Sequence, residues 1–276
     1  MPELPEVETV ARDLGRRIAG FQIQNAELRR ERLAPDISPI SFNERLSGAS
    51  IRFVHRRGKH ILVDLDNGQT LLAHLRMSGR FMLLSEEDPD PRFAHAVFHL
   101  SDGRRLVFDD QRHFGLMKVI ETVGVKETKE IAKLAPEPFS DDFSPAFFAD
   151  RVRSSSRTIK EILLDQTKIC GVGNIYASEA MFLSGISPKK RGRNISRGRC
   201  SVLHENIRSV LQEAIDLAAT IEPHPKFIGE GVYGIGSDAR WRIYDREGLP
   251  CIACSAIVKR ITQSGRSTYY CSKCQR

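Results

Sequence analysis

Four cysteines near the end of the chain have the residue type and spacing of a metal site. They are Cys251, Cys254, Cys271 and Cys274, which form two Cys-x2-Cys pairs. Thiolates at this spacing bind Zn²⁺ tetrahedrally, and four protein ligands leave no position for a catalytic water. The pattern predicts one structural Zn²⁺. Between the pairs, Gln263-Ser264-Gly265-Arg266 predicts a hairpin turn with Arg266 at its tip, and such a ribbon either contacts DNA or is purely structural.

A glycine-rich segment is a candidate anion site. Gly171-Val-Gly173-Asn174 leads into a predicted helix, for which Asn174 is the expected N-cap. Backbone N–H groups at a helix start can bind a phosphate oxygen. Taken alone, the segment fits a glycine turn before a capped helix better than a phosphate site.

The N-terminus offers a possible nucleophile. Removal of Met1 would leave Pro2 with a free secondary amine, and α-amino groups have a pKa of roughly 7.7 to 8.0. Such an amine could attack a sugar C1′ and form an iminium ion, with Glu3 and Glu6 available to transfer protons. On these residues alone the simpler interpretation is favoured, in which both carboxylates stabilise the positive end of a helix.

The elements that must position these residues follow from hydrophobic periodicity. Apolar residues at spacings of three and four predict a helix over 4–18. Alternating runs, several of them separated by turns such as Asp66-Asn67-Gly68 and Asp102-Gly103, predict an antiparallel sandwich or barrel over about 21–120. The expected strands include Ile61–Leu65, Thr70–Leu75, Ala96–Leu100 and Arg105–Phe108. Beyond a proline-rich linker, helices are expected at about 144–153, 157–165, 174–184 and 200–220. The chain is therefore predicted to be an α+β multidomain protein with a boundary near residue 140.

Composition limits the class of partner. The chain has 276 residues, with 42 Lys+Arg against 35 Asp+Glu and a net charge of +7. This excess favours a polyanion such as nucleic acid, although a basic solvated surface would look the same. Neither a membrane span nor a signal peptide is found, so we expect no membrane association and a reducing, cytoplasmic location. There, Cys170 and Cys200 are expected to be ordinary thiols.

Six motifs occur in the order found in one protein family. They are Met1-Pro-Glu-Leu-Pro-Glu-Val-Glu-Thr9, Arg56-Arg-Gly-Lys59, His74-Leu-Arg-Met-Ser-Gly79, Phe108-x-Asp-x-Arg-x-Phe-Gly115, Gly171-Val-Gly-Asn-Ile-Tyr-Ala-Ser-Glu179 and the cysteine ribbon. Over nearly its whole length the sequence resembles the formamidopyrimidine-DNA glycosylase / endonuclease VIII family, and it is most similar to the bacterial formamidopyrimidine-DNA glycosylases.

The resemblance implies a bifunctional base-excision repair enzyme. It would remove oxidised purines, FapyG and 8-oxoguanine, from duplex DNA and nick the strand by β,δ-elimination. The implied architecture is a helix plus β-sandwich over 1–140, a helix-two-turn-helix domain over 141–245 and a four-cysteine zinc finger over 246–276, with DNA between the domains. The enzyme would be a monomer acting on double-stranded DNA with a damaged base, in the bacterial cytoplasm at the nucleoid.

The resemblance also assigns residue roles. Pro2 would be the Schiff-base nucleophile, Glu3 the acid/base group on the deoxyribose, and Glu6 a supporting carboxylate. Lys59 would bind the phosphate beside the lesion and assist elimination. The remaining DNA-binding residues would be Met77, Arg112, Phe114, Lys160, Asn174 and Arg266. Of these, Asn174 and Arg266 would bind phosphates, while Met77, Arg112 and Phe114 would fill the gap left by the flipped nucleotide.

One segment departs from the family pattern and leaves the substrate open. Residues 221–236 carry two prolines and an altered glycine arrangement in the loop that would cover the flipped base. The three gap-filling residues favour oxidised purines. The alternatives are an endonuclease VIII-like enzyme for oxidised pyrimidines and a non-catalytic protein that binds lesions.

Overall fold

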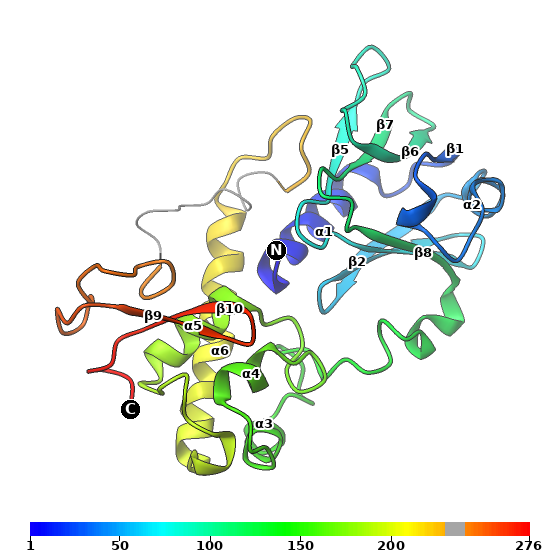
Figure 1. Ribbon diagram of the computed structural model, residues 1–276. Helices are drawn as coiled ribbons and strands as arrows, with labels where there is room; N and C mark the ends of the chain where they lie inside the picture. Colours follow the sequence, from blue (N-terminus) through cyan, green and yellow to red (C-terminus); the bar gives the residue numbers. More distant parts are fainter. Residues whose placement is uncertain (230–240) are drawn as a thin grey trace. The chain divides into compact units, whose positions relative to one another are not determined.

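The computed structural model describes residues 1–229 and 241–276 (Figure 1). It divides into two compact units. The first contains residues 1–132 and the described residues from 217 to 229, and the second contains residues 133–216 and those from 241 onward. The predicted α+β class is confirmed. Among the described residues, no helix is both long and apolar enough to cross a membrane.

Helix α1 (Leu4–Ile18) opens the first unit and confirms the helix predicted over 4–18. Its apolar stripe of Val7, Val10, Leu14 and Ile18 is buried in the main core. The helix packs on strand β2 (Ile51–Arg57). The start of α1 is therefore fixed against the β domain.

Two four-stranded sheets form the sandwich, and all neighbouring strands are antiparallel. One sheet has the order β1 (Ile23–Leu28), β6 (Ala94–Leu100), β7 (Arg105–Asp109) and β5 (Arg80–Leu84). The other has the order β2, β3 (His60–Leu65), β4 (Gln69–His74) and β8 (Leu116–Glu121). The first unit also contains α2 (Pro39–Leu46) and the 3₁₀ turns η1 (Glu31–Leu33) and η2 (Thr122–Glu127). The core contains residues from both sheets, such as Val63 and Phe98.

The glycine turns behave as the sequence predicts. Gly68 has φ +78° in the β3–β4 connection, and Gly103 has φ +84° between β6 and β7. Glycine adopts this left-handed conformation without a steric penalty. Both hairpins therefore form where the turn residues place them.

Four helices dominate the second unit, as predicted, with ends that differ from the predicted ones by a few residues. They are α3 (Pro145–Arg153), α4 (Ile159–Leu164), α5 (Asn174–Leu183) and α6 (Arg197–Ala219), with the 3₁₀ turn η3 (Gly192–Asn194) between the last two. Ser144 caps α3 by accepting a hydrogen bond from the backbone N of Phe147 at 3.2 Å. The lone cysteines Cys170 and Cys200 are buried thiols.

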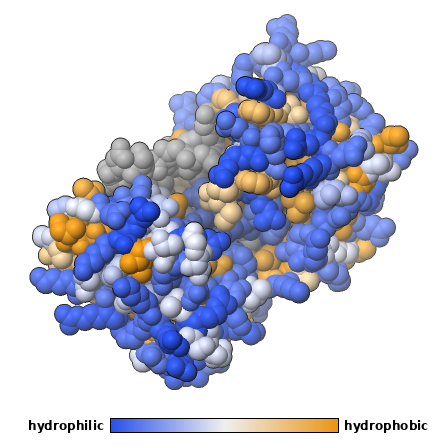
Figure 2. Space-filling model, viewed as in Figure 1, coloured by the Kyte–Doolittle hydropathy of each residue, from blue (hydrophilic) through white to orange (hydrophobic). Residues whose placement is uncertain are grey.

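The unit ends in a two-stranded ribbon, β9 (Lys259–Gln263) and β10 (Arg266–Tyr270). Ser264 and Gly265 form its turn with φ +48° and +72°, which fits a two-residue type I′ hairpin. The tip is therefore Ser264-Gly265, and Arg266 is the first residue of β10, opposite Gln263, not the tip itself. The face of the molecule in Figure 2 is mostly hydrophilic, with apolar residues in small separate patches.

Candidate functional site

The start of α1 brings together Pro2, Glu3 and Glu6. Pro2 is buried, and the two carboxylate residues are only 3% and 9% exposed. The backbone N of Glu3 donates to Oε2 of Glu6 at 2.7 Å, so Glu6 satisfies one of the free N–H groups at the helix start. Met1 is exposed. The structure therefore places two acidic groups next to the residue whose amine Met1 removal would release.

Lys59 lies in the two-residue turn between β2 and β3. Arg57 pairs with His60 across this turn, and Gly58 has φ +59° at its first position, as in a type II′ hairpin. The Lys59 side chain is 6% exposed. A tight hairpin thus fixes the backbone that carries this cation.

Two buried histidines pack together in the same unit. The rings of His60 and His74 meet edge to face with centroids 4.7 Å apart. Burial lowers the pKa of His60 to about 4. Burial, followed by the charges of His60, Arg76 and Lys59, lowers the pKa of His74 to about 2. His74 is therefore neutral at pH 7, and its Nδ1 accepts a hydrogen bond from the Arg76 backbone N at 2.9 Å.

Two loops carry the predicted gap-filling side chains. Met77 is 45% and Phe114 50% exposed, although both are large and apolar. The Arg112 guanidinium lies 5.4 Å from the centroid of the Phe114 ring. The backbone N of Arg112 donates to Oγ of Ser78 at 3.0 Å, which joins the loop of Arg112 to the loop of Met77. The structure therefore links the two loops through Ser78, whose only signal in the sequence is its place in a motif.

Asn174 is bound to the strand that begins with Arg266, and it is not the N-cap of α5 that the sequence predicts. The N-cap of α5 is Gly173, and Asn174 is the first helical residue. Since Asn174 lies inside the helix, its side chain does not cap it and can bind another part of the chain. Its Nδ2 donates to the backbone carbonyl of Ser267 at 3.0 Å. Asn174 is thereby bound to the residue next to Arg266.

Lys160, which the resemblance places among the DNA-binding residues, is fully buried. Its Nζ donates to the backbone carbonyl of Asn174 at 2.9 Å and to Oγ of Ser178 at 2.7 Å. A buried ammonium needs such partners to offset its desolvation. Lys160 therefore supports the start of α5 from inside the protein and adds positive charge beneath it.

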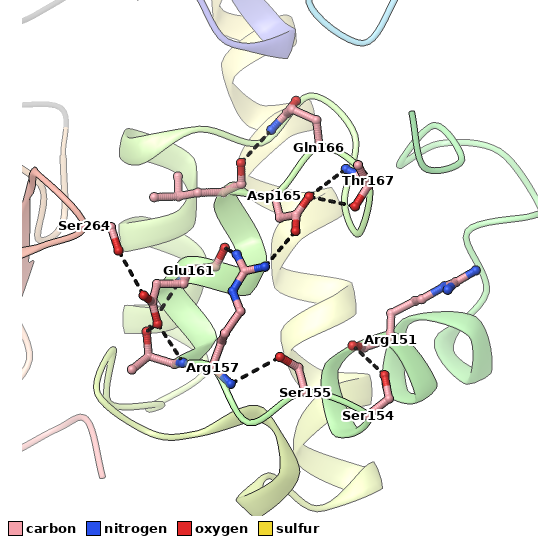
Figure 3. Close-up of polar contacts among 11 residues, drawn as sticks. Arg151, Ser154, Ser155, Arg157, Glu161, Asp165, Gln166, Thr167 and Ser264 are labelled. Atoms are coloured by element: carbon pink, nitrogen blue, oxygen red, sulfur yellow. Dashed lines mark hydrogen bonds and ion pairs between the residues drawn. The ribbon is translucent and has the colours of Figure 1, made fainter. Parts of the chain in front are cut away.

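The ribbon tip is anchored to α4 (Figure 3). Ser264 Oγ donates to Oε1 of Glu161 at 2.9 Å. Hydrogen bonds from the Thr158 side chain and backbone and from Ser264 lower the pKa of Glu161, so the carboxylate stays ionised. Arg157 lies beside this contact and pairs with Asp165 at 2.8 Å. The ribbon is thus fixed both at Glu161 and at Asn174.

Glu179 supports the start of the zinc module, residues 241–276, and its place in the Gly171–Glu179 motif did not predict this role. The side chain is 1% exposed. Its carboxylate accepts hydrogen bonds at 2.9 Å from the backbone N atoms of Arg242, Ile243 and Tyr244. Three N–H donors satisfy a buried carboxylate. Helix α5 therefore positions the chain as it enters the module.

The four cysteines fit a tetrahedral zinc ion. All four sulfurs lie within 4.8 Å of one another. The Sγ atoms of Cys251 and Cys274 are 3.8 Å apart, and those of Cys254 and Cys271 are 3.5 Å apart. Zn–S bonds of about 2.3 Å in a tetrahedron place sulfurs about 3.8 Å apart. These residues hold one structural zinc, as predicted.

Comparisons with known proteins cover the whole chain. Residues 1–117 match the formamidopyrimidine-DNA glycosylase N-terminal domain, 134–224 the H2TH domain of the same glycosylase, and 248–276 the zinc finger found in FPG and IleRS. The chain is 41% identical to a formamidopyrimidine-DNA glycosylase of Ruegeria sp., with 100% of both proteins covered. It is 40% identical to one of Chloroflexus aggregans, with 100% of this chain and 98% of the relative covered.

The chain belongs to the formamidopyrimidine-DNA glycosylase family. Solved structures agree with this assignment. A Lactococcus lactis Fpg bound to DNA with an abasic site matches with a TM-score of 0.90 and 31% identity over 99% of each chain. A point mutant of the Lactococcus lactis Fpg, bound to DNA containing Fapy-dG, matches with a TM-score of 0.90 and 32% identity over 100% of each chain. Members of this family are DNA glycosylases of base excision repair, and the predicted β-sandwich, H2TH domain and four-cysteine finger are confirmed.

Proposed function

We propose that this glycosylase is bifunctional: it excises oxidised purines, FapyG and 8-oxoguanine, from duplex DNA and then cleaves the strand by β,δ-elimination. The observation that carries the proposal is the placement of Pro2 directly before Glu3 and Glu6, both buried at the start of α1. A secondary amine flanked by carboxylates supplies the nucleophile and the proton transfer that the chemistry requires.

The amine of Pro2 would act after Met1 is removed. Its lone pair attacks C1′, and the glycosidic bond breaks so that the base leaves with the bonding electrons and the proton that the Pro2 nitrogen releases. Glu3 protonates the ring oxygen O4′ as the sugar opens to the iminium ion. The iminium then accepts electrons when C2′ loses a proton to the Glu3 carboxylate and the 3′ phosphate leaves, and a second elimination releases the 5′ phosphate. Water hydrolyses the final iminium and frees Pro2.

Backbone phosphates would be bound by residues of both units. Lys59 on its hairpin would bind the phosphate beside the lesion, and Asn174 and Arg266 would bind others. The start of α5 supports this role, because helix N-termini attract anions and Lys160 adds charge beneath this one. Segments 1–140, 141–245 and 246–276 would act as the catalytic, H2TH and zinc-finger parts of a monomer on damaged duplex DNA.

Oxidised pyrimidines are a second candidate, and one observation favours keeping it. A wild-type Lactococcus lactis Fpg with 31% identity and a TM-score of 0.90 was solved with DNA containing an oxidised pyrimidine. Part of the unusual segment is bound to α1, because Arg17 donates to the carbonyls of His224 at 2.7 Å and Pro225 at 2.8 Å, but these bonds favour neither class of lesion. The rest of the predicted loop, 230–236, lies outside the described residues.

Excision from a panel of lesion duplexes tests the proposal. We expect 8-oxoguanine opposite C and FapyG to be excised faster than dihydrouracil or thymine glycol, with phosphate at both ends of the gap. A preference for the pyrimidines would replace the purine assignment with the second candidate. Tight lesion binding without any cleavage, after correct removal of Met1, would instead indicate a non-catalytic lesion-binding protein.

A further inference from the structure

The loops of Met77 and of Arg112 and Phe114 converge on one buried carboxylate, that of Asp110. This residue is 0% exposed. Its Oδ1 accepts a hydrogen bond from Oγ of Ser78, and its Oδ2 accepts one from the backbone N of Gly115 at 2.7 Å. Asp110 thus bonds both to the residue after Met77 and to the residue after Phe114.

Ser78 also joins the two loops by accepting a hydrogen bond from the loop of Arg112. Its Oγ accepts from the backbone N of Arg112 at 3.0 Å while it donates to Asp110. The Arg112 N also lies 3.3 Å from Asp110 Oδ1. The hydrogen bonds of Ser78 to Asp110 and of Arg112 to Ser78 join the two loops, so neither loop can shift alone without losing them.

Steric contacts allow little further movement. A Cβ atom on Gly79 would lie 2.6 Å from Cζ of Phe108, and one on Gly115 would lie 2.7 Å from Cε1 of the same ring. Both loops therefore close on the edge of one buried aromatic side chain, at separations that only glycine permits.

Asp110 is itself fixed to the neighbouring strand connection. Its backbone N donates to the carbonyl of Phe93 at 3.1 Å, and its carbonyl lies 2.9 Å from Nε2 of His95. These bonds fix the backbone of Asp110, and so the position of its carboxylate. The exposed side chains of Met77 and Phe114 extend from a base that is already ordered.

We propose that Asp110 is a positioning residue for base eversion: it holds the three gap-filling side chains in one arrangement before DNA arrives. The inference rests on the proposed function. Side chains on a preordered base lose less conformational freedom when they enter the stack, which makes insertion more favourable. Asp110 acts through the two loops, so its effect is confined to substrates that must be unstacked.

Two substrates separate this role from catalysis. One is a duplex with 8-oxoguanine opposite C, in which eversion leaves a gap. The other is a single-stranded oligonucleotide with an abasic site, which has no partner strand and no gap. Asp110→Asn places an amide donor against the Ser78 or Gly115 donor, so one buried acceptor is lost. Single-turnover excision is measured on the duplex, and borohydride trapping is measured on both substrates.

We expect Asp110→Asn to slow duplex excision about 10- to 100-fold while single-strand trapping changes less than about twofold. Ser78→Ala should lower the ratio of duplex excision to single-strand trapping, and Ser78→Thr, which keeps the hydroxyl, should restore it. The matched control is Asp109→Asn, because Asp109 is also buried but pairs with Arg80 at 2.9 Å. It should leave the ratio unchanged.

The inference is overturned if Asp110→Asn lowers both activities equally or leaves duplex excision intact. It is also overturned if Asp109→Asn changes the ratio as much as Asp110→Asn does. If Asp110→Asn does not fold, the comparison of Ser78→Ala with Ser78→Thr carries the test. If the wild-type protein formed an adduct on neither of the two substrates, the proposed function would be refuted instead.

Discussion

Asn174 and Ser267 are joined by a 3.0 Å hydrogen bond from the Asn174 side chain to the Ser267 carbonyl. The bond connects the first residue of α5 to strand β10 of the zinc ribbon, across 93 positions of sequence. It brings the glycine-rich segment and Arg266, two separate anion-site candidates in the sequence, to neighbouring positions. The zinc module therefore has a defined place relative to α5, and a role for the ribbon in presenting Arg266 follows from it.

Replacing Arg266 with Ala should weaken lesion-duplex binding uniformly across sequences. Loss of one phosphate contact lowers the slope of log K against log salt by about 0.9. Fluorescence anisotropy at several salt concentrations measures this slope. Arg260→Ala is the matched control, since Arg260 is also an exposed arginine of the ribbon but pairs with Glu247 at 3.2 Å. An equal change of slope in both variants would argue against a specific phosphate contact by Arg266.

Sequence patterns predicted the elements whose causes are local. Helix α1 follows from its apolar spacing, and the hairpins follow from Asp66-Asn67-Gly68 and Asp102-Gly103. The zinc ligands follow from their spacing, because metal coordination requires little else of the chain. Each of these features is decided by residues close together in sequence.

Other features depend on distant partners and could not be predicted. The N-cap of α5 is Gly173, and the Asn174 side chain binds the Ser267 carbonyl instead of capping the helix. Lys160 is buried because Asn174 and Ser178 accept its hydrogen bonds. Sequence patterns identify residue types, but they do not show which residue, 14 or 93 positions away, is the hydrogen-bond partner of a given side chain.

Removing zinc should abolish tight binding to lesion DNA while the first unit stays folded. Without metal the four thiols no longer hold the module, because binding free energy of such a site is folding free energy. We expect affinity to fall more than about tenfold after chelation. Hydrogen exchange should show lost protection over 241–276 and unchanged protection in α1 and both sheets. Zinc-free protein with full lesion affinity and excision would contradict this role of the ribbon.

Stability should fall as the pH drops below about 6.5. His60 and His74 have folded pKa values of about 4 and about 2, whereas an unfolded histidine titrates near 6.5. The unfolded state therefore binds more protons between these values, and stability that is full above about pH 6.5 is lost as the pH decreases toward about 4. Each histidine contributes about 1.4 kcal/mol per pH unit in this window.

Urea unfolding of the wild type and of His74→Gln at pH 7 and pH 5 measures this effect. The variant should lose less unfolding free energy between the two pH values than the wild type does. His99→Gln is the control, because His99 is partly exposed and pairs with Glu27 at 2.7 Å. Equal losses in the wild type and in His74→Gln would show that His74 is not the buried neutral group described.

Shortening the inserted side chains should impair excision from duplexes. Met77→Ala and Phe114→Ala remove apolar surface that would replace lost base stacking, so excision of 8-oxoguanine should slow about tenfold or more in each variant. Val123→Ala is the control, since Val123 is 87% exposed and belongs to neither loop. Rapid-quench excision under single-turnover conditions gives the rates. Unchanged rates in both loop variants would mean that these side chains do not fill the gap.

The most direct test of the central claim is mass spectrometry of the protein after borohydride trapping on an 8-oxoguanine duplex. We predict that the unreacted chain lacks Met1 and that the reduced DNA adduct maps to the nitrogen of Pro2. The Pro2→Gly variant should trap poorly. An adduct on the Nζ of Lys59, or no adduct on a chain that has correctly lost Met1, would contradict the assignment of Pro2 as the nucleophile.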